Sequence, residues 1–186
     1  MSIQNPWKTL STRVVYSNPW ITVREDQVIR PDGQPGIYGC VETRLATGVI
    51  AMTPNREIYL VGQFRYTMDE YSWEIVEGGS DPGEDALKAI QRELREEAGL
   101  VAEHWRSLGA EIHLTNCHSD ERAYLYLATG LAEVPAEPEG TEELQVRKVP
   151  FEEALRMVDA GEIKDAMSML ALLRLDRMLR AGEIAV

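Results

Sequence analysis

The chain has 186 residues and a formal net charge of -12, and 44% of its residues are hydrophobic. This length predicts one globular domain with a substantial core and room for a small extra subdomain. The acidic excess argues against a nucleic-acid backbone as the main partner, because such a backbone is bound by basic patches. It leaves phosphorylated small molecules open, since a bound metal ion can invert the local field.

The sequence has no recognisable targeting signal, and its two cysteines could pair but form no recognisable framework. Residues 1–8 lack the apolar core of a signal peptide, and no apolar run approaches the roughly 18 residues of a membrane span. Cys40 and Cys117 have no spacing typical of a disulfide scaffold or a zinc site. We therefore expect a cytoplasmic protein with reduced thiols and no membrane partner.

The first 45 residues predict a small antiparallel sheet. Short strands are expected over 13–16, 21–28 and 37–42, with a Pro/Asp/Gly-rich turn over 31–36. A sheet of this size is marginal alone and needs a partner to cover it. The partner is either the rest of the chain or a second copy, so residues 1–45 are a candidate dimerising region.

Residues 46–186 predict a larger domain that mixes strands with helices. Between residues 78 and 100 lies the most strongly marked helix, which is treated separately below. An acidic, proline-bearing segment over 131–143 predicts an exposed, mobile loop. The other expected elements are a strand pair over 48–53 and 57–66 around a turn at 54–56, strands over 73–77, 108–114, 121–128 and 144–149, and helices over 151–160 and 164–180.

Clear end signals mark the helix expected between residues 78 and 100. Asp81 suits the N-cap, Pro82 the first helical position and Glu84 the third position of a capping box, while Gly99 provides a C-terminal stop. Apolar residues recur at helical spacing and should face the core. These residues are Leu87, Ile90, Leu94 and Ala98.

Three carboxylates gather on the last two turns of this helix. Glu93 and Glu97 are four residues apart, and Glu96 is three from Glu93. Like charges at this spacing repel by a few tenths (~0.2–0.5) of a kcal/mol per pair on an exposed helix. Hard oxygen ligands on a rigid helix suit Mg²⁺ or Mn²⁺, which would convert the repulsion into binding. The alternative, for this run alone, is a solvated acidic face.

The spacing over the whole stretch resembles the signature of the Nudix hydrolase family. Gly78 is followed by five residues, Glu84, seven residues and then Arg-Glu-Leu-Arg-Glu-Glu-Ala-Gly-Leu over 92–100. The resemblance implies an α/β/α sandwich around a mixed sheet over 46–186. It also implies a loop-helix-loop that holds divalent metal against a nucleoside diphosphate linked to another group, which water then hydrolyses.

The same resemblance assigns roles within the stretch. Glu93 and Glu97 would bind metal, Glu97 being central to catalysis, with Glu96 and the backbone carbonyl of Glu77 as further ligands. Arg92 would pair with Glu84 to brace the loop, which suits a bidentate guanidinium. Gly78 and Gly99 would be structural.

Flanking segments resemble the ADP-ribose and nucleotide-sugar branch of the family. Residues 63–66 (Gln-Phe-Arg-Tyr) and 71–74 (Tyr-Ser-Trp-Glu) imply that Arg65 lies near the diphosphate and Glu74 near the substrate. Read alone, each is also consistent with an ordinary exposed charge at a strand end. Residues 161–166 and 170–173 resemble the end of that branch. Residues 75–78 and 114–119 depart from it, and the second departure weakens ADP-ribose as the preferred substrate.

A general base is expected on the late acidic loop. In this branch it often is a glutamate there, which makes Glu139, Glu142 and Glu143 the candidates. Such a carboxylate can accept a proton from metal-bound water. His118 and Cys117 are better interpreted as plain loop residues, because no third orienting group is evident.

The resemblance leads to one expected function and two alternatives. We expect Mg²⁺-dependent (or Mn²⁺-dependent) hydrolysis of a nucleoside diphosphate sugar to a nucleoside monophosphate and a sugar phosphate, by a homodimer. The first alternative is ADP-ribose as substrate, and the second is a Nudix-fold module that senses a nucleotide without turning it over. The base, the sugar and the pathway stay open, because specificity depends on pocket shape.

Overall fold

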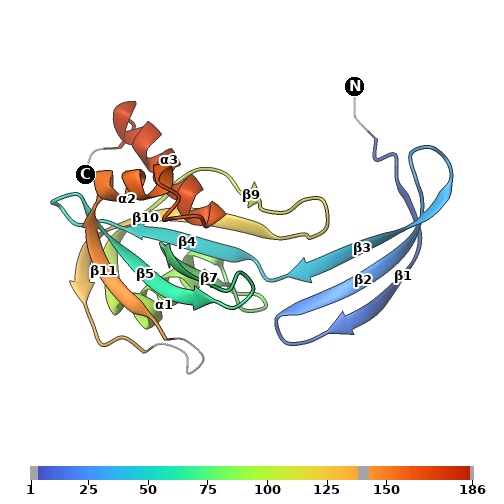
Figure 1. The fold of residues 1–186 in the computed structure, drawn as a ribbon, viewed down its shortest axis with the longest axis horizontal. Coiled ribbons are helices and arrows are strands. Elements are labelled where there is room, and N and C mark those ends of the chain that lie inside the picture. Colours follow the sequence, from blue (N-terminus) through green and yellow to red (C-terminus); the bar gives the residue numbers. More distant parts are fainter. Residues whose placement is uncertain (1–3, 138–142, 185–186) are drawn as a thin grey trace. The chain divides into compact units, whose positions relative to one another are not determined.

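The computed structural model describes residues 4–137 and 143–184 (Figure 1). The chain divides into two compact units, one formed by Met1–Arg44 with His113–Arg122 and the other by Leu45–Ile112 with Ala123–Val186. Within the described residues no helix has the length and apolar character needed to cross a membrane.

An antiparallel sheet of three strands forms most of the first unit. Strand β1 (Lys8–Ser17) pairs with β2 (Ile21–Ile29), which pairs with β3 (Pro35–Thr43). The expected small antiparallel sheet is therefore confirmed, with longer strands than predicted. Residues of the 113–122 segment lie against β3, since Val41 N–H donates to the His118 carbonyl at 2.8 Å and Tyr38 Oη–H to the Cys117 carbonyl at 2.6 Å.

Two sheets make up the second unit. The larger has the order β7-β4-β10-β8, with β9 also on β10, and the smaller has the order β11-β5-β6. Strands β4 and β10 are parallel, whereas β4–β7, β10–β8, β11–β5 and β5–β6 are antiparallel, which confirms the mixed sheet. The bounds are β4 (Ala46–Ala51), β5 (Glu57–Arg65), β6 (Glu70–Glu74), β7 (Val76–Gly79), β8 (Leu100–Ser107), β9 (Ile112–His113), β10 (Arg122–Glu133) and β11 (Gln145–Pro150).

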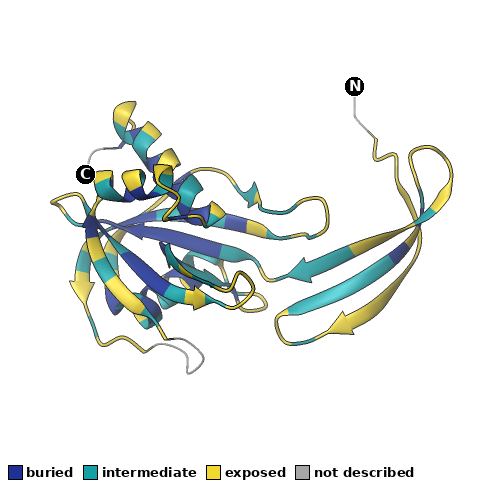
Figure 2. Cartoon of the chain, in the orientation of Figure 1, coloured by how far each residue is buried: buried dark blue, intermediate teal, exposed yellow. Residues whose placement is uncertain are grey.

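Helices cover both faces of β4. Helix α1 (Ala86–Ala98) packs on Val49 and Ala51 through Ile90 and Leu94. Helix α3 (Ala166–Arg180) approaches the other face, where a Cβ on Gly48 would meet the end of the Met167 side chain at 3.2 Å. Helix α2 (Phe151–Asp159) contacts β11, β5 and α3. The buried colouring of β4 in Figure 2 reflects this α/β/α arrangement, which agrees with the expected fold class.

The strands over 48–53 and 57–66 do not pair in one sheet as predicted. Strand β4 lies in the larger sheet and β5 in the smaller one, and they meet only at an isolated bridge between Met52 and Ile58. Thr53 N–H donates to the Glu57 carbonyl at 2.9 Å and Arg56 has φ 59°, so residues 53–57 form a tight turn. The strands on either side of this turn then diverge into different sheets.

The strands differ from the sequence-based expectation at two further places. Residues 100–107 form β8, which was not predicted because most of its exposed positions carry polar residues and only Leu100, Ala102 and Trp105 pack on the core. Residues 131–133, expected in a mobile loop, continue β10, where Leu131 pairs with Ala102. An edge strand exposed on one side gives a weak apolar signal in the sequence.

Candidate active site

The carboxylate-bearing helix begins later than the sequence predicts. Its N-cap is Asp85, whose side chain accepts from the backbone N–H groups of Leu87 and Lys88, so the expected cap at Asp81 was wrong. Residues 81–84 instead form a turn in which Glu84 N–H donates to the Asp81 carbonyl at 2.9 Å and Gly83 has φ 83°. Proline followed by glycine at the centre favours such a turn over the first turn of a helix.

Gly99 ends the helix as expected. Its φ of 63° is left-handed, and its N–H donates to the Arg95 carbonyl at 3.1 Å. The apolar stripe also lies where it was predicted, because Ile90 and Leu94 are fully buried while Leu87 and Ala98 pack on the same core cluster.

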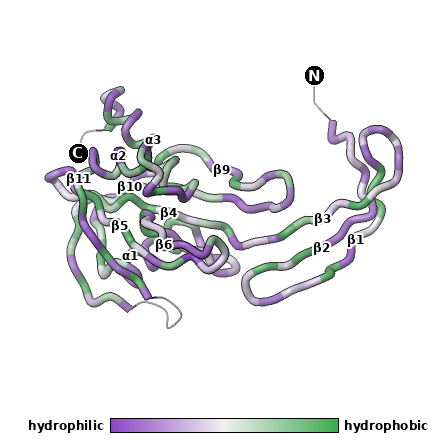
Figure 3. The backbone as a smooth tube through the Cα atoms, viewed as in Figure 1, coloured by the Kyte–Doolittle hydropathy of each residue, from purple (hydrophilic) through white to green (hydrophobic). Residues whose placement is uncertain are grey.

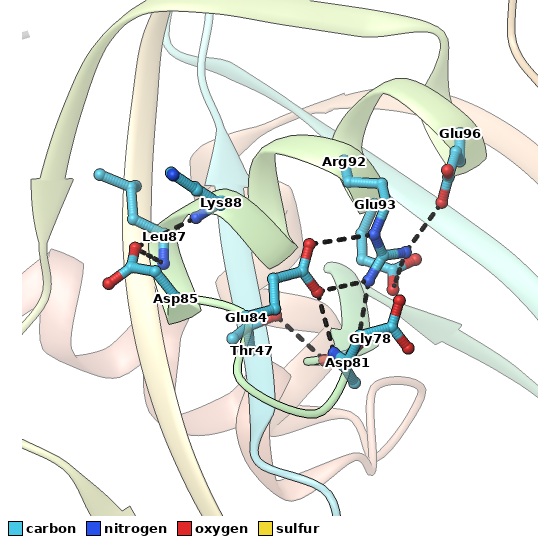
Figure 4. A network of polar contacts seen from close by, with 11 residues as sticks. Thr47, Gly78, Asp81, Glu84, Asp85, Leu87, Lys88, Arg92, Glu93 and Glu96 are labelled. Atoms are coloured by element: carbon cyan, nitrogen blue, oxygen red, sulfur yellow. Dashed lines mark hydrogen bonds and ion pairs between the residues drawn. The ribbon is translucent and has the colours of Figure 1, made fainter. Parts of the chain in front are cut away.

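Arg92 gathers the acidic side chains of this region (Figure 4). Its Nη2 lies 3.1 Å from Glu84 Oε2, so the expected brace is present. Its Nη1 lies 2.8 Å from Glu93 Oε1 and 3.0 Å from Glu96 Oε2. The contact with Arg92 lowers the pKa of Glu84 and raises the pKa of Arg92. One guanidinium therefore offsets part of the repulsion among the carboxylates.

Gly78 makes room for the Glu93 carboxylate. A Cβ at Gly78 would lie 2.1 Å from Glu93 Cδ, far inside van der Waals contact. The Gly78 carbonyl accepts from the Thr47 hydroxyl at 3.0 Å, which fixes this point of the backbone (Figure 4). The strand β7 thus presents a gap shaped for one carboxylate of α1.

The strand register places the Glu77 carbonyl on the same side of β7 as the Gly79 carbonyl. Ser80 N–H donates to the Leu45 carbonyl at 2.8 Å, so these two residues form a hydrogen-bonded pair. From there along β7 and β4, opposed residues alternate between pairs without and pairs with backbone hydrogen bonds. Gly79 and Glu77 fall in pairs without ladder bonds, and the Gly79 carbonyl accepts from Arg92 Nη2 at 3.1 Å. The Glu77 carbonyl therefore faces away from β4, on the side of β7 where the Gly79 carbonyl meets Arg92.

These donors fit a hard divalent cation by their chemistry. Glu93, Glu96, Glu97 and the Glu77 carbonyl all offer oxygen atoms, the donor type that such a cation prefers, and Glu97 is only 5% exposed. Among residues 4–137 and 143–184, no three acidic, histidine or cysteine side chains already surround one point. In this structure Glu93 and Glu96 bind Arg92 instead.

A cavity of about 430 Å³ lies at the ends of β5 and β6 and the start of α3. Arg65 Nε donates to Glu74 Oε1 at 2.9 Å and its Nη2 donates to the other oxygen, a bidentate pair in which Glu74 is buried. Lys164 Nζ lies 2.8 Å from Glu70 Oε2 on the same cavity wall. The predicted substrate residues Arg65 and Glu74 therefore lie together, and the contact with Glu74 raises the pKa of Arg65.

A buried polar link joins the cavity wall to β7. Ser168 Oγ–H donates to Glu77 Oε1 at 2.7 Å, and Asp165, which also lines the cavity, accepts from Ser168 N–H at 2.7 Å. Burial, followed by the nearby Asp165 carboxylate, raises the pKa of Glu77 well above its usual value. The Glu77 side chain is therefore held on the α3 side, whereas its carbonyl was the expected ligand.

The expected general bases are only partly visible. Glu139 and Glu142 lie outside the described residues, and Glu143 is exposed just before β11. The described start of this loop runs along the end of α1, because Glu137 N–H donates to the Glu96 carbonyl at 3.1 Å. Cys117 and His118 lie in the first unit, with Sγ 3.1 Å from Nδ1.

The arrangement of a carboxylate-bearing helix against a glycine-bearing strand, in a mixed sheet between helices, agrees with the hydrolase family that the comparisons identify. The family model described as "NUDIX domain" matches residues 42–170, and one described as "Nucleoside diphosphate sugar hydrolase N-terminal domain" matches residues 7–41. The chain belongs to the Nudix family and is a Nudix hydrolase. Hydrolases of this family generally need a divalent metal ion.

Relatives with printed activities cover nearly the whole chain. An ADP-ribose pyrophosphatase of Mycobacterium tuberculosis (strain ATCC 25618 / H37Rv) is 34% identical over 174 residues, covering 91% of this chain and 83% of the relative. One from Bacillus subtilis (strain 168) is 29% identical over 178 residues, covering 94% and 96%. The crystal structure of an ADP compounds hydrolase matches with a TM-score of 0.86 at 20% identity, covering 98% of both chains, which supports the fold.

Sequence reasoning missed several residues of this region. Glu70 and Lys164 line the cavity, and Ser168 and Glu137 bind the segments that carry predicted ligands. The sequence could have pointed to two of them. Lys164 lies within the 161–166 segment that resembles the family branch, and Ser168 follows this segment closely. Glu70 and Glu137 had no signal, since each is an ordinary charge until the fold places it.

Proposed function

We propose that this Nudix hydrolase cleaves the diphosphate bond of a nucleoside diphosphate sugar with Mg²⁺, giving a nucleoside monophosphate and a sugar phosphate. The observation that carries the proposal is the packing of Glu93 into the gap at Gly78, beside the carboxylates of α1. Every proposed donor is a hard oxygen, which suits Mg²⁺, and Mn²⁺ is an alternative because it prefers the same donors.

Glu93, Glu96, Glu97 and the Glu77 carbonyl are the proposed metal-binding groups. When bound, the metal neutralises diphosphate charge and acidifies a water molecule. Arg92 forms ion pairs with Glu84, Glu93 and Glu96. It also donates to the Gly79 carbonyl, which helps to hold the backbone next to Gly78. Its role is thus structural.

Arg65 is the proposed diphosphate-binding cation of the cavity. Its guanidinium is partly exposed, while Glu74 is buried and bound to it through both oxygens. A bidentate pair fixes the plane of the guanidinium, so its remaining donors have a defined direction. Glu74 therefore orients Arg65 within the cavity.

One glutamate of the late loop is the proposed general base. The hydrogen bonds from Val134 N–H to the Gly99 carbonyl and from Glu137 N–H to the Glu96 carbonyl start this loop beside the carboxylates of α1. Single Gln variants of Glu139, Glu142 and Glu143 would identify it, as loss of one base should cost about 100- to 10,000-fold in kcat.

ADP-ribose is the first substrate to test, because two relatives that cover nearly the whole chain are ADP-ribose pyrophosphatases. The experiment measures phosphate released by an added phosphatase from ADP-ribose, nucleotide sugars, dinucleoside polyphosphates and nucleoside triphosphates, with and without Mg²⁺. Metal-dependent turnover of a nucleotide sugar or ADP-ribose is expected. Tight binding of one compound without turnover of any would favour a sensor instead.

Residues 1–45 are proposed to form a homodimer, with residues 46–186 as the hydrolase domain. All of β1 is exposed. Figure 3 shows hydrophobic residues interspersed with hydrophilic ones along β1–β3, and several of the apolar side chains in and next to these strands are exposed. These side chains are Trp7, Leu10, Val14, Val15, Tyr16, Trp20, Ile37 and Tyr38. This number of exposed apolar side chains on one small sheet supports an interaction surface there.

The cytoplasm is the proposed location. Cys40 and Cys117 are both free in the structure, as expected for a reducing compartment. The proposed partner is a small nucleotide substrate, with neither nucleic acid nor membrane involved.

A further inference from the structure

Ser168 is a completely buried polar residue in the first turn of α3. Its hydroxyl donates to Glu77 Oε1 at 2.7 Å and accepts from the backbone N–H of Ile75 at 3.0 Å. A serine hydroxyl offers one donor, so its donor and an acceptor position are both engaged here. The Ser168 side chain therefore holds residues 75–77 at two points, the Ile75 N–H and the Glu77 carboxylate.

The position of this hydroxyl is fixed by the start of the helix. Asp165 is the N-cap of α3, and its carboxylate accepts from Ser168 N–H at 2.7 Å. The next turn is anchored in the core, since Ala171 and Leu172 are fully buried. Ser168 thus presents its hydroxyl from a rigid element rather than from a loop.

The segment held by Ser168 connects the two halves of the proposed site. At one end Glu74 orients Arg65 in the cavity. At the other end are the Glu77 carbonyl and Gly78, which packs on Glu93. A hydrogen bond at Ile75 and another at Glu77 fix the course of the chain between them.

We infer that Ser168 is a positioning residue, which sets the Glu77 carbonyl and Gly78 against the carboxylates of α1 and so tunes metal binding. The inference rests on the proposed function and deepens it. Outer groups that orient metal ligands typically contribute about 10- to 100-fold to metal affinity. Ser168 acts through Glu77 and contacts neither metal nor substrate in this scheme.

The test measures Mn²⁺ binding to the substrate-free protein by electron paramagnetic resonance, with melting temperature and steady-state kinetics alongside. Ser168→Ala should weaken Mn²⁺ binding by about 10- to 100-fold. The Arg65–Glu74 pair, which is proposed to bind the diphosphate, stays intact, so KM should change little. The main effect should be a lower kcat. Ser168→Thr, which keeps the hydroxyl, should recover most of the Mn²⁺ affinity.

Met178→Ala is the matched control, a buried truncation in the same helix without a polar contact to β7. It should lower the melting temperature and leave Mn²⁺ affinity unchanged. Unchanged Mn²⁺ affinity in Ser168→Ala, equal weakening by Met178→Ala, or equal loss in the Thr and Ala variants would each overturn the inference. A wild-type protein that binds Mn²⁺ but hydrolyses no compound of the panel would overturn the proposed function alone.

Discussion

Arg92 gives the acidic helix its internal counter-ion. Its planar guanidinium reaches Glu84, Glu93 and Glu96 at once and also donates to the Gly79 carbonyl. A lysine could not match this, because its ammonium is a single point charge without a fixed fork. One arginine thus holds together the loop, the strand and the helix that carry the proposed ligands.

Glu97→Gln tests the metal assignment at a single residue. The amide cannot carry the charge that a divalent ion requires, so kcat should fall by at least about 100-fold, or roughly 2.7 kcal/mol of barrier. The fold should persist, because Gln has nearly the same shape. Glu103→Gln, an exposed change on β8, is the control and should keep wild-type kcat. Full activity in Glu97→Gln would contradict the assignment.

Gly78→Ala tests the gap that receives Glu93. The new Cβ would overlap the end of the Glu93 side chain, which is flexible, so the carboxylate should move while the fold stays intact. We expect weaker Mg²⁺ activation with a nearly unchanged melting temperature. Gly39→Ala is the control, because a Cβ there meets no atom within 4 Å. Wild-type Mg²⁺ activation in Gly78→Ala would show that Glu93 binds no metal.

The pKa of Glu84 predicts a pH dependence of stability. Arg92, and then the Asp81 N–H, lower this pKa below its ordinary 4.5. The unfolded state therefore takes up the proton first as pH falls, and the stabilisation present above about pH 4.5 is lost as pH drops through the folded-state pKa. Urea unfolding of wild type and Glu84→Gln should differ at neutral pH and converge in acid. A difference that grows in acid would contradict this sign.

At the scale of elements, the start of α1 gives a direct comparison of two aspartates. Asp85→Ala removes the N-cap and should cost about 1 kcal/mol of unfolding free energy. Asp81→Ala should cost less, because Asp81 begins a turn and does not cap the helix. Urea denaturation of both variants measures the difference, and a larger loss for Asp81→Ala would restore the cap expected from the sequence.

Elements with strong periodic or end signals were predictable. The apolar stripe of α1 and its stop at Gly99 follow from local rules, and so does the hairpin turn before β3. Strand β8 was missed because its polar residues Glu103, His104 and Arg106 face away from the core. The split between β4 and β5 was missed because a turn sequence does not reveal which sheet the next strand joins.

The candidate site also contains some residues that the sequence predicts and others that only the fold brings together. Glu84, Arg92, Glu93, Glu96 and Glu97 lie within one short stretch, so spacing alone groups them. Ser168 lies 91 residues after Glu77, and only the packing of α3 on β4 brings them within 2.7 Å. Contacts of that kind depend on tertiary structure, which no local pattern encodes.

At the scale of the whole molecule, the exposed apolar side chains of β1–β3 predict a dimer. Light scattering after size exclusion should give about twice the 21.0 kDa chain mass. Val14 is 62% exposed in the single chain. Val14→Glu should shift the protein toward monomer, because it would place a charge in the proposed interface.

Leu173→Glu on α3 provides the control for this prediction, since Leu173 is also exposed but lies in the second unit. It should leave the measured mass unchanged. A wild-type protein that runs as a monomer at high concentration would contradict the dimer.

The link between Ser168 and residues 75–77 also concerns how the protein is made. Synthesis delivers the whole 78–100 stretch long before α3 exists, so a nascent or truncated chain ending short of residue 168 carries every residue of the family signature. Such a chain still lacks the hydroxyl that bonds to Ile75 and Glu77. The family signature is therefore complete in the growing chain before the two hydrogen bonds from Ser168 to residues 75 and 77 can form.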